Sequence, residues 1–162
     1  MRFLVDQSLK GLAKWLRLAG LDAAVTDFSP DGRALPAPAP GTVILTRKAG
    51  PGQAQRDDVL VLAANDPENQ LAEVMRRLKL SRADLAPLSR CGECNDLLLP
   101  APREKALGSV PDHIFHTQAE FFQCPRCGRF YWFGSHPARI AAKLAQVLED
   151  EHGSRKGASH DL

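Results

Sequence analysis

Four cysteines carry the clearest chemical pattern in the chain. They stand as two Cys-x-x-Cys pairs, Cys91 with Cys94 and Cys124 with Cys127, and the chain has no other cysteine. Each pair can place two thiolates on one side of a tight turn, called a knuckle here, and two facing knuckles complete a tetrahedron around Zn²⁺. Residues 95–123 separate the pairs, more than the roughly 15–20 residues usual for such sites, so a hairpin or loop fits between them. The pattern predicts a structural zinc site with four cysteine ligands.

Three other interpretations of the cysteines stay open: a disulfide framework, a thioredoxin-like redox pair, and a degenerate site that binds no metal. The chain opens without an apolar leader and has no run near the roughly 20 apolar residues of a membrane span. We therefore expect a cytoplasmic protein with reduced thiols, which favours metal over disulfides. His113, His116 and His136 are substitute ligands that four cysteines make unnecessary. A closed four-thiolate site performs no catalysis, so the activity must come from other residues.

Aspartates at the ends of apolar runs are the second group able to do chemistry. Asp6 follows the first apolar run, Asp27 ends the next, and Asp31 lies four residues further on. Because ligands bind at the carboxyl ends of strands in an open α/β sheet, these carboxylates are candidates to hold Mg²⁺ or Mn²⁺. Such an ion activates water for displacement at phosphorus. The alternative for each residue is the common role of aspartate as a turn former or helix cap.

Basic and aromatic side chains are candidate contacts for nucleic acid. Lys10, Lys14 and Arg17 recur at helical spacing, and such a stripe can meet a phosphate backbone, although a solvated helix face is the more common outcome. The net charge is only +2, so bulk charge does not indicate a polybasic binder. Aromatic residues around the second pair either stack on bases or form a small core beside the metal: Phe121, Phe122, Phe130, Tyr131, Trp132 and Phe133.

The elements that position these residues follow an α/β pattern in the first half of the chain. Apolar runs predict strands, and periodic apolar positions predict helices; the strands are 3–5, 22–27, 43–45 and 59–62, and the helices 9–19 and 67–80. Ser8 and Asp66 are the predicted N-caps, and Gly20 is the predicted stop of the first helix. Residues 28–42 alternate proline with alanine, which excludes a helix there. The order of elements predicts a parallel sheet in residues 1–84.

The second half predicts a smaller module. A linker is expected before the cysteines, and the cysteine module is followed by a helix that Ser135 or His136 caps and that presents an apolar stripe. At 162 residues, with 44% hydrophobic and 25% charged side chains, the chain is typical of a soluble globular protein. We predict an α/β domain at 1–84, a zinc ribbon with a C-terminal helix at 91–149, and a disordered tail at 150–162.

Several of these segments resemble the Mut-seven C-terminal RNase domain family. Residues 3–6 (Phe-Leu-Val-Asp) and 11–22 are similar to the family's opening, and residues 44–47 are similar to its third strand. Cys91-x-x-Cys94 and residues 124–136 are similar to its ribbon and the segment after it. The resemblance covers residues 1–149. It implies a PIN-like fold with a zinc ribbon, and a metal-dependent ribonuclease that acts on RNA.

Carried over residue by residue, the resemblance makes Asp6 the strand-one acid of the site. After strand two the family typically has acidic residues and a helix, and here at most Asp31 remains. After strand three it typically reads Thr-Arg-Asp, where this chain has Thr46-Arg47-Lys48. That exchange shifts the charge beside the proposed ion by two units, each on the order of 1–4 kcal/mol at about 4 Å.

The resemblance therefore leaves two expectations for the function. The first is a ribonuclease with a weakened acidic site, in which Asp6, Asp31 and Asp27 hold Mg²⁺ or Mn²⁺. The second is a catalytically impaired module that binds RNA or a protein partner and keeps the zinc ribbon. In both, Arg47 and Lys48 join the basic stripe as candidate phosphate contacts.

Overall fold

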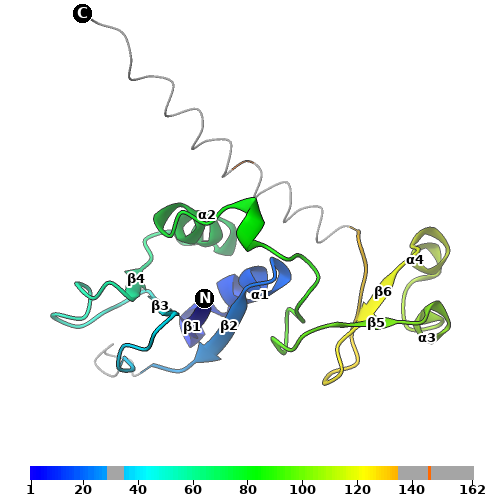
Figure 1. Cartoon of the computed structure of the whole chain (residues 1–162), viewed down its shortest axis with the longest axis horizontal. Helices are drawn as coiled ribbons and strands as arrows, with labels where there is room; N and C mark the ends of the chain where they lie inside the picture. Colours follow the sequence, from blue (N-terminus) through cyan, green and yellow to red (C-terminus); the bar gives the residue numbers. More distant parts are fainter. Residues whose placement is uncertain (29–34, 135–145, 147–162) are drawn as a thin grey trace, which may run out of the picture.

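The computed structural model of the chain describes residues 1–28, 35–134 and 146. An α/β module lies beside a smaller cysteine module, residues 91–134, and residues 85–90 link the two (Figure 1). Three predictions fall outside the described residues: the acid Asp31, the helix after Ser135 or His136, and the tail at 150–162. None of the described helices is long and apolar enough to cross a membrane.

A four-stranded parallel sheet forms the centre of the α/β module, with strand order β2-β1-β3-β4. Its strands are β1 (Arg2–Asp6), β2 (Asp22–Thr26), β3 (Thr42–Thr46) and β4 (Val59–Val61). The interior strand β1 pairs with both neighbours, and Val5 lies opposite Val25 on one side and Leu45 on the other. All four strands run in one direction, so their carboxyl ends meet at one edge, which confirms the predicted α/β fold with a parallel sheet.

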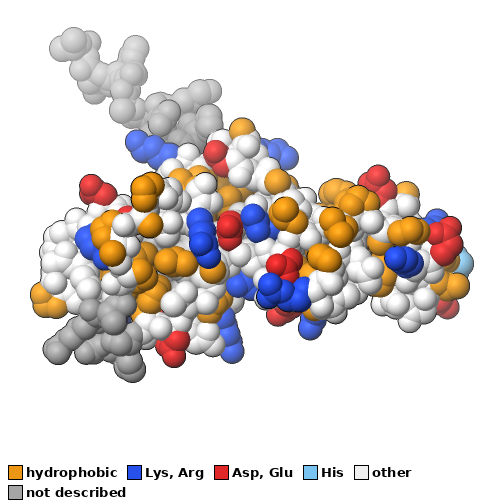
Figure 2. All heavy atoms as spheres, turned by 60° about the horizontal axis from the view of Figure 1, so that its bottom comes forward, with side chains coloured by type: hydrophobic (Ala, Val, Ile, Leu, Met, Phe, Trp, Pro, Cys, Tyr) orange, Lys and Arg blue, Asp and Glu red, His pale blue; other side chains and the backbone are white. Residues whose placement is uncertain are grey.

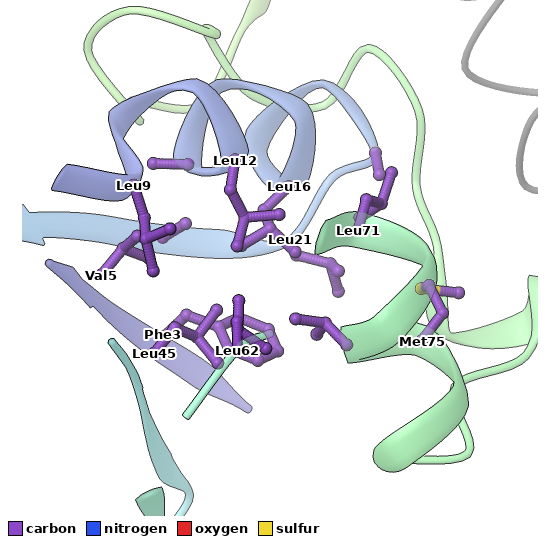
Figure 3. Close-up of a cluster of buried hydrophobic side chains, with 14 of the residues drawn as sticks. Phe3, Val5, Leu9, Leu12, Leu16, Leu21, Leu45, Leu62, Leu71 and Met75 are labelled. Carbon is purple, nitrogen blue, oxygen red and sulfur yellow. The ribbon is translucent and has the colours of Figure 1, made fainter. Parts of the chain in front are cut away.

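Two helices pack on this sheet through a continuous apolar core. They are α1 (Lys10–Leu18) and α2 (Pro67–Arg77), with 3₁₀ turns at Gln7–Leu9 and Arg82–Asp84. Figure 3 shows Phe3 and Val5 of β1 facing Leu12 of α1, with Leu71 and Met75 of α2 in the same cluster. These side chains are almost fully buried, and burial of each contributes about 1.5–3 kcal/mol.

The helix caps agree with the sequence at two of three positions. The Asp66 carboxylate accepts a hydrogen bond from the Asn69 amide at 3.0 Å and caps α2 as predicted. Gly20 ends the first helix at φ 91° as predicted. The prediction for Ser8 is wrong, because a 3₁₀ turn precedes α1 and the Ser8 amide donates to Asp6 Oδ1 at 3.1 Å. Asp6 is thus the cap, and Ser8 is the residue that it caps.

The cysteine module is built on a small antiparallel sheet of strands β5 (Leu99–Ala101), β6 (Phe121–Gln123) and β7 (Phe130–Tyr131). Two short helices, α3 (Arg103–Ala106) and α4 (Asp112–Thr117), occupy the interval between the cysteine pairs. They contribute to a core around Phe121, which is 2% exposed and packs with Ala106 and Val110. Phe121 therefore belongs to the small core that the sequence predicted, whereas Phe133 is exposed.

Candidate functional site

The four cysteines meet at one point of the cysteine module. Their sulfur atoms all lie within 4.8 Å of one another, and Cys91 Sγ is 3.7 Å from Cys127 Sγ. Zn–S bonds of about 2.3 Å place neighbouring sulfurs of a tetrahedron about 3.8 Å apart. All four cysteines are free thiols, which contradicts the disulfide alternative. The donor set and its spacing fit a tetrahedral ion, so the four cysteines can hold a metal such as zinc.

The two knuckles share one backbone pattern. In each, the amide of the first cysteine bonds to the carbonyl five residues on, at 2.8 Å after Cys91 and 2.9 Å after Cys124. The amide four residues on bonds back to that cysteine's carbonyl, at 3.0 and 2.9 Å respectively. This fourth residue has a positive φ, 67° at Asn95 and 73° at Gly128, and these are the residue types that tolerate it. Each knuckle is therefore shaped by its own backbone.

Neighbouring hydrogen-bond donors favour ionisation of one of the four cysteines, Cys91. Burial alone would raise the pKa of Cys91, but hydrogen bonds from Tyr131 and the amides of Cys94 and Glu93 lower that pKa to about 7. Burial and the neighbouring sulfurs raise the pKa of Cys94 to about 12. The Tyr131 hydroxyl lies 3.1 Å from Cys91 Sγ and accepts a bond from the Gly92 amide at 3.1 Å. A divalent cation would remove the repulsion that keeps the second thiol protonated.

Arg17 differs from the sequence prediction of an exposed basic stripe, because its side chain is buried. Its Nε donates to the Ala23 carbonyl at 2.7 Å, and its Nη1 donates to the carbonyls of Gly92 and Glu93 at 3.1 and 2.8 Å. With only 9% of the residue exposed, the guanidinium is occupied inside the fold and is no surface contact for nucleic acid. It joins the edge strand β2 to the first knuckle.

Asn95 completes this junction from the other side. Its Oδ1 accepts the Ala23 amide at 3.1 Å, and its Nδ2 donates to Asp22 Oδ1 at 2.7 Å. Both outward-facing backbone groups of Ala23 on the edge strand are thereby bonded, one to Asn95 and one to Arg17. We call Arg17, Asn95 and Ala23 the latch. It covers a sheet edge that would otherwise offer free backbone groups.

At the carboxyl edge of the sheet, Asp6 is held by two contacts. Its Oδ2 lies 3.3 Å from the Thr46 hydroxyl, and its Oδ1 accepts the Ser8 amide. Thr46 is 1% exposed, and its hydroxyl also bonds the carbonyl and the amide of Lys48, at 2.8 and 3.2 Å. The turn after β3 is therefore fastened next to Asp6, which is itself half-buried. The structure brings Asp6 together with the backbone of the residue that replaces the expected acid.

The other residues predicted at this edge have different surroundings. The Arg47 guanidinium donates to the Ala64 carbonyl and to Asn65 Oδ1, at 3.0 Å for the latter, and so ties two loops together. Asp27 is exposed just beyond β2. Among residues 1–28, 35–134 and 146, the cysteines are the only group of three or more His, Cys, Asp or Glu side chains close enough to share an ion.

Sequence reasoning missed two residues that shape these sites. Glu73 is 8% exposed, and its carboxylate accepts the amides of Ala63 and Ala64, each at 3.1 Å, which fixes the turn after β4. Asn95 is the other, and a signal for it was present. Asparagine directly after a Cys-x-x-Cys pair is one of the few residue types suited to positive φ.

The comparison with known proteins adds one finding. The model of the Mut7-C RNAse domain family matches residues 1–144, a span that includes the α/β module, the latch and both knuckles. No curated protein and no solved structure matches the chain significantly.

Proposed function

Since the chain belongs to the Mut7-C RNAse domain family, we propose that it is a ribonuclease that cleaves RNA at the carboxyl edge of its parallel sheet. The observation that carries the proposal is the setting of Asp6. It ends an interior strand, at the edge where α/β folds bind ligands; its Oδ1 accepts the Ser8 amide at 3.1 Å, and its Oδ2 lies 3.3 Å from the buried Thr46 hydroxyl. A carboxylate held in this way is prepared to bind a divalent ion.

In this proposal, Asp6 holds Mg²⁺ or Mn²⁺, and Asp27 and Asp31 add carboxylate oxygens. One or two carboxylates together with substrate phosphate are the usual donors for Mg²⁺ in proteins. The ion, when bound, supplies an activated water and stabilises charge at phosphorus. Lys10 and Lys48 are exposed, and in sequence each lies within a few residues of Asp6 or Thr46 at the carboxyl edge. In the proposal these two lysines contact RNA phosphates. Asp6 itself orients the ion, and the Ser8 amide keeps that carboxylate in place.

The cysteine module has a supporting role in the proposal. A closed site of four thiolates holds Zn²⁺ for structure and leaves no open position for a reacting group. Through the latch it fixes the edge strand β2, whose carboxyl end leads to Asp27. Zinc thus stabilises the frame on which the acidic edge is built.

The test is cleavage of an end-labelled single-stranded RNA by purified protein with added Mn²⁺. Wild-type protein should cleave, and Asp6→Asn, which keeps the shape and removes the charge, should fall to background. The matched control is Asp57→Asn, because Asp57 is an exposed loop residue before β4. Equal cleavage by wild type and Asp6→Asn, or none by either, would refute the proposal.

A second candidate is an RNA-binding module that does not cleave. Two observations favour it: Lys48 stands where the family has an acid, and Asp6 lacks two further acidic partners among the described residues. Wild-type protein that retards RNA on a gel with steep salt dependence, yet leaves the RNA intact, would support this candidate. Failure to bind RNA even at low salt would leave a protein-interaction module.

A further inference from the structure

A cleft of about 490 Å³ lies between α1 and the cysteine module, away from the residues of the acidic edge. Lys14 and Leu18 line it from α1; Arg129 of the second knuckle, Tyr131 of β7 and Trp132 just after that strand line it from the cysteine module. Its volume falls within the about 300–1,000 Å³ of small-molecule sites. Figure 2 shows Lys and Arg side chains, mixed with acidic ones, over the narrow region between the modules.

The two aromatic rings of the cleft are held by other contacts. The Tyr131 hydroxyl is bonded at the first knuckle, to Cys91 and Gly92. Trp132 packs edge-on against Phe121, with ring centroids 6.5 Å apart. Gly134 lies so near that a Cβ there would be 2.7 Å from the indole Nε1. Because these rings are already fixed, a ligand that stacks on them would not have to pay the entropy of immobilising their side chains.

The charges of the cleft favour an anion. Arg129 is exposed, and its guanidinium makes no hydrogen bond or close ion pair within the described residues. Its backbone carbonyl accepts the Cys124 amide at 2.9 Å, so the knuckle fixes its position. Lys14 forms an ion pair with Glu93 at 2.6 Å. Among the side chains that line the cleft, the two cations Lys14 and Arg129 therefore face the single carboxylate of Glu93.

Helix α1 leads from the cleft towards the proposed cleavage edge. Lys10 and Lys14 are one helical turn apart on the same side of that helix, about 6 Å along its axis. The 3₁₀ turn that leads into α1 begins directly after Asp6. From Lys14 back to Asp6 the chain covers about 14 Å, at about 1.5 Å per residue in α1 and about 2.0 Å in the 3₁₀ turn, a distance that a few nucleotides of RNA span.

We propose that this cleft binds one nucleotide of single-stranded RNA, with Trp132 and Tyr131 stacked on its base and Arg129 paired with its phosphate. The proposal rests on the proposed RNA function and adds a substrate subsite to it. Stacking on an aromatic side chain is tolerant of base identity, so the subsite selects single-stranded over duplex RNA rather than a sequence.

The experiment uses the fluorescence of Trp132 in the full chain. Trp15 and Trp132 are the two tryptophans, so Trp15→Phe leaves one reporter in the cleft. Titration with an eight-nucleotide single-stranded RNA, without added Mg²⁺ or Mn²⁺, should quench this fluorescence. Trp132→Leu, made with Trp15 intact, should weaken binding, measured by anisotropy of labelled RNA, by roughly 5- to 150-fold. Circular dichroism and zinc content confirm that each variant is folded.

Arg129→Ala tests the phosphate contact. It should lower affinity and reduce the slope of log K against log salt by about 0.7, the value for one phosphate contact on a single strand. Arg129→Lys should restore part of the affinity. The control is Arg126→Ala, on the same knuckle but outside the cleft and paired with Asp96 at 2.6 Å. It should leave both the salt slope and the quenching unchanged.

The outcomes separate this inference from the proposed cleavage. Asp6-dependent cleavage with no quenching of Trp132, and unchanged binding by Arg129→Ala, would overturn the cleft and leave the ribonuclease in place. Quenching that Arg129→Ala weakens, together with no cleavage by wild type, would support the cleft and refute the ribonuclease. An equal loss in Arg126→Ala and Arg129→Ala would point to general electrostatics and would overturn the subsite.

Discussion

Replacement of Arg17 by methionine should release the cysteine module from the sheet. Methionine keeps an unbranched apolar stem and removes the guanidinium that bonds the carbonyls of Ala23, Gly92 and Glu93. Hydrogen bonds to a charged group contribute about 1.5–3 kcal/mol each, so three bonds sum to about 4.5–9 kcal/mol. The measured loss should be smaller, about 3–5 kcal/mol, because the module can separate and return the carbonyls to water, which reduces the cost of leaving them without a donor.

The size of this effect can be measured by urea or thermal unfolding followed by circular dichroism. For a chain of this length, a loss of about 3–5 kcal/mol lowers Tm by roughly 6–20 °C. Hydrogen exchange adds a local measure, because the Ala23 amide is bonded to Asn95 across the latch. Its protection should fall in Arg17→Met, while that of the interior strand β1 should change less.

The control for this prediction is Lys14→Met, one turn earlier on α1. Lys14 reaches the side chain of the same residue, Glu93, but as an ion pair whose side chains are 51% and 40% exposed. Exposed pairs of this kind contribute about 0.2–1 kcal/mol. A loss in Arg17→Met no larger than that in Lys14→Met, or unchanged exchange at Ala23, would refute the assignment of Arg17 as the latch.

Three further predictions concern the metal, the acidic edge and pH. Purified protein should contain about one zinc per chain, and chelation should raise protease cleavage in residues 85–90; a metal content far below one would contradict the four-thiolate site. Lys48→Asp should increase Mn²⁺-dependent cleavage, since it moves the local charge by two units towards the cation; no change, with Lys48→Ala as control, would show that residue 48 lies too far from the ion. The hydrogen bond from Arg56 lowers the pKa of Asp58, so the unfolded state binds that proton more readily and the pair stabilises the fold above about pH 4. The stability difference between wild type and Asp58→Asn should therefore shrink as pH falls through the lowered pKa, and a difference that stays constant would contradict this.

The sheet and the metal cluster could be predicted from the sequence because their signals are local. Short apolar runs such as residues 43–45 are buried strands almost wherever they occur in an α/β fold. The spacing of paired cysteines predicts that their thiols can converge on one metal ion. In both cases the residues that form the feature are the same residues that carry the pattern.

Arg17 could not be placed in this way. On α1 alone it continues the spacing of Lys10 and Lys14, and a charged residue at that position is normally solvated. It is buried because the Ala23 carbonyl of the edge strand and two carbonyls of the first knuckle, far away in sequence, lie close together and accept its hydrogen bonds. No local sequence pattern indicates that these three carbonyls require a hydrogen-bond donor from α1.

The prediction that Ser8 caps the first helix is wrong for a different reason. Ser8 is a favourable cap residue, but a stronger cap, Asp6, lies close to it in the sequence. Asp6 lies two residues earlier and accepts the Ser8 amide, so the carboxylate serves as the cap and a 3₁₀ turn forms before α1. The same aspartate is the candidate ligand of the acidic edge. The two roles are compatible, because the cap uses Oδ1 whereas Oδ2 faces Thr46.

The approach of Gly20 to residues 85–90 decides where this chain can be divided. A Cβ at Gly20 would lie 2.1 Å from the Ala86 carbonyl oxygen, and the Ala86 amide donates to the Ala19 carbonyl at 3.0 Å. The segment between the modules therefore packs directly against the end of α1 and is not a free linker. A fragment ending at residue 84 would lose the backbone that packs against the end of this helix, together with Asn95, which accepts the Ala23 amide of β2. Any fragment, circular permutant or fusion made from either module should therefore include residues 85–96.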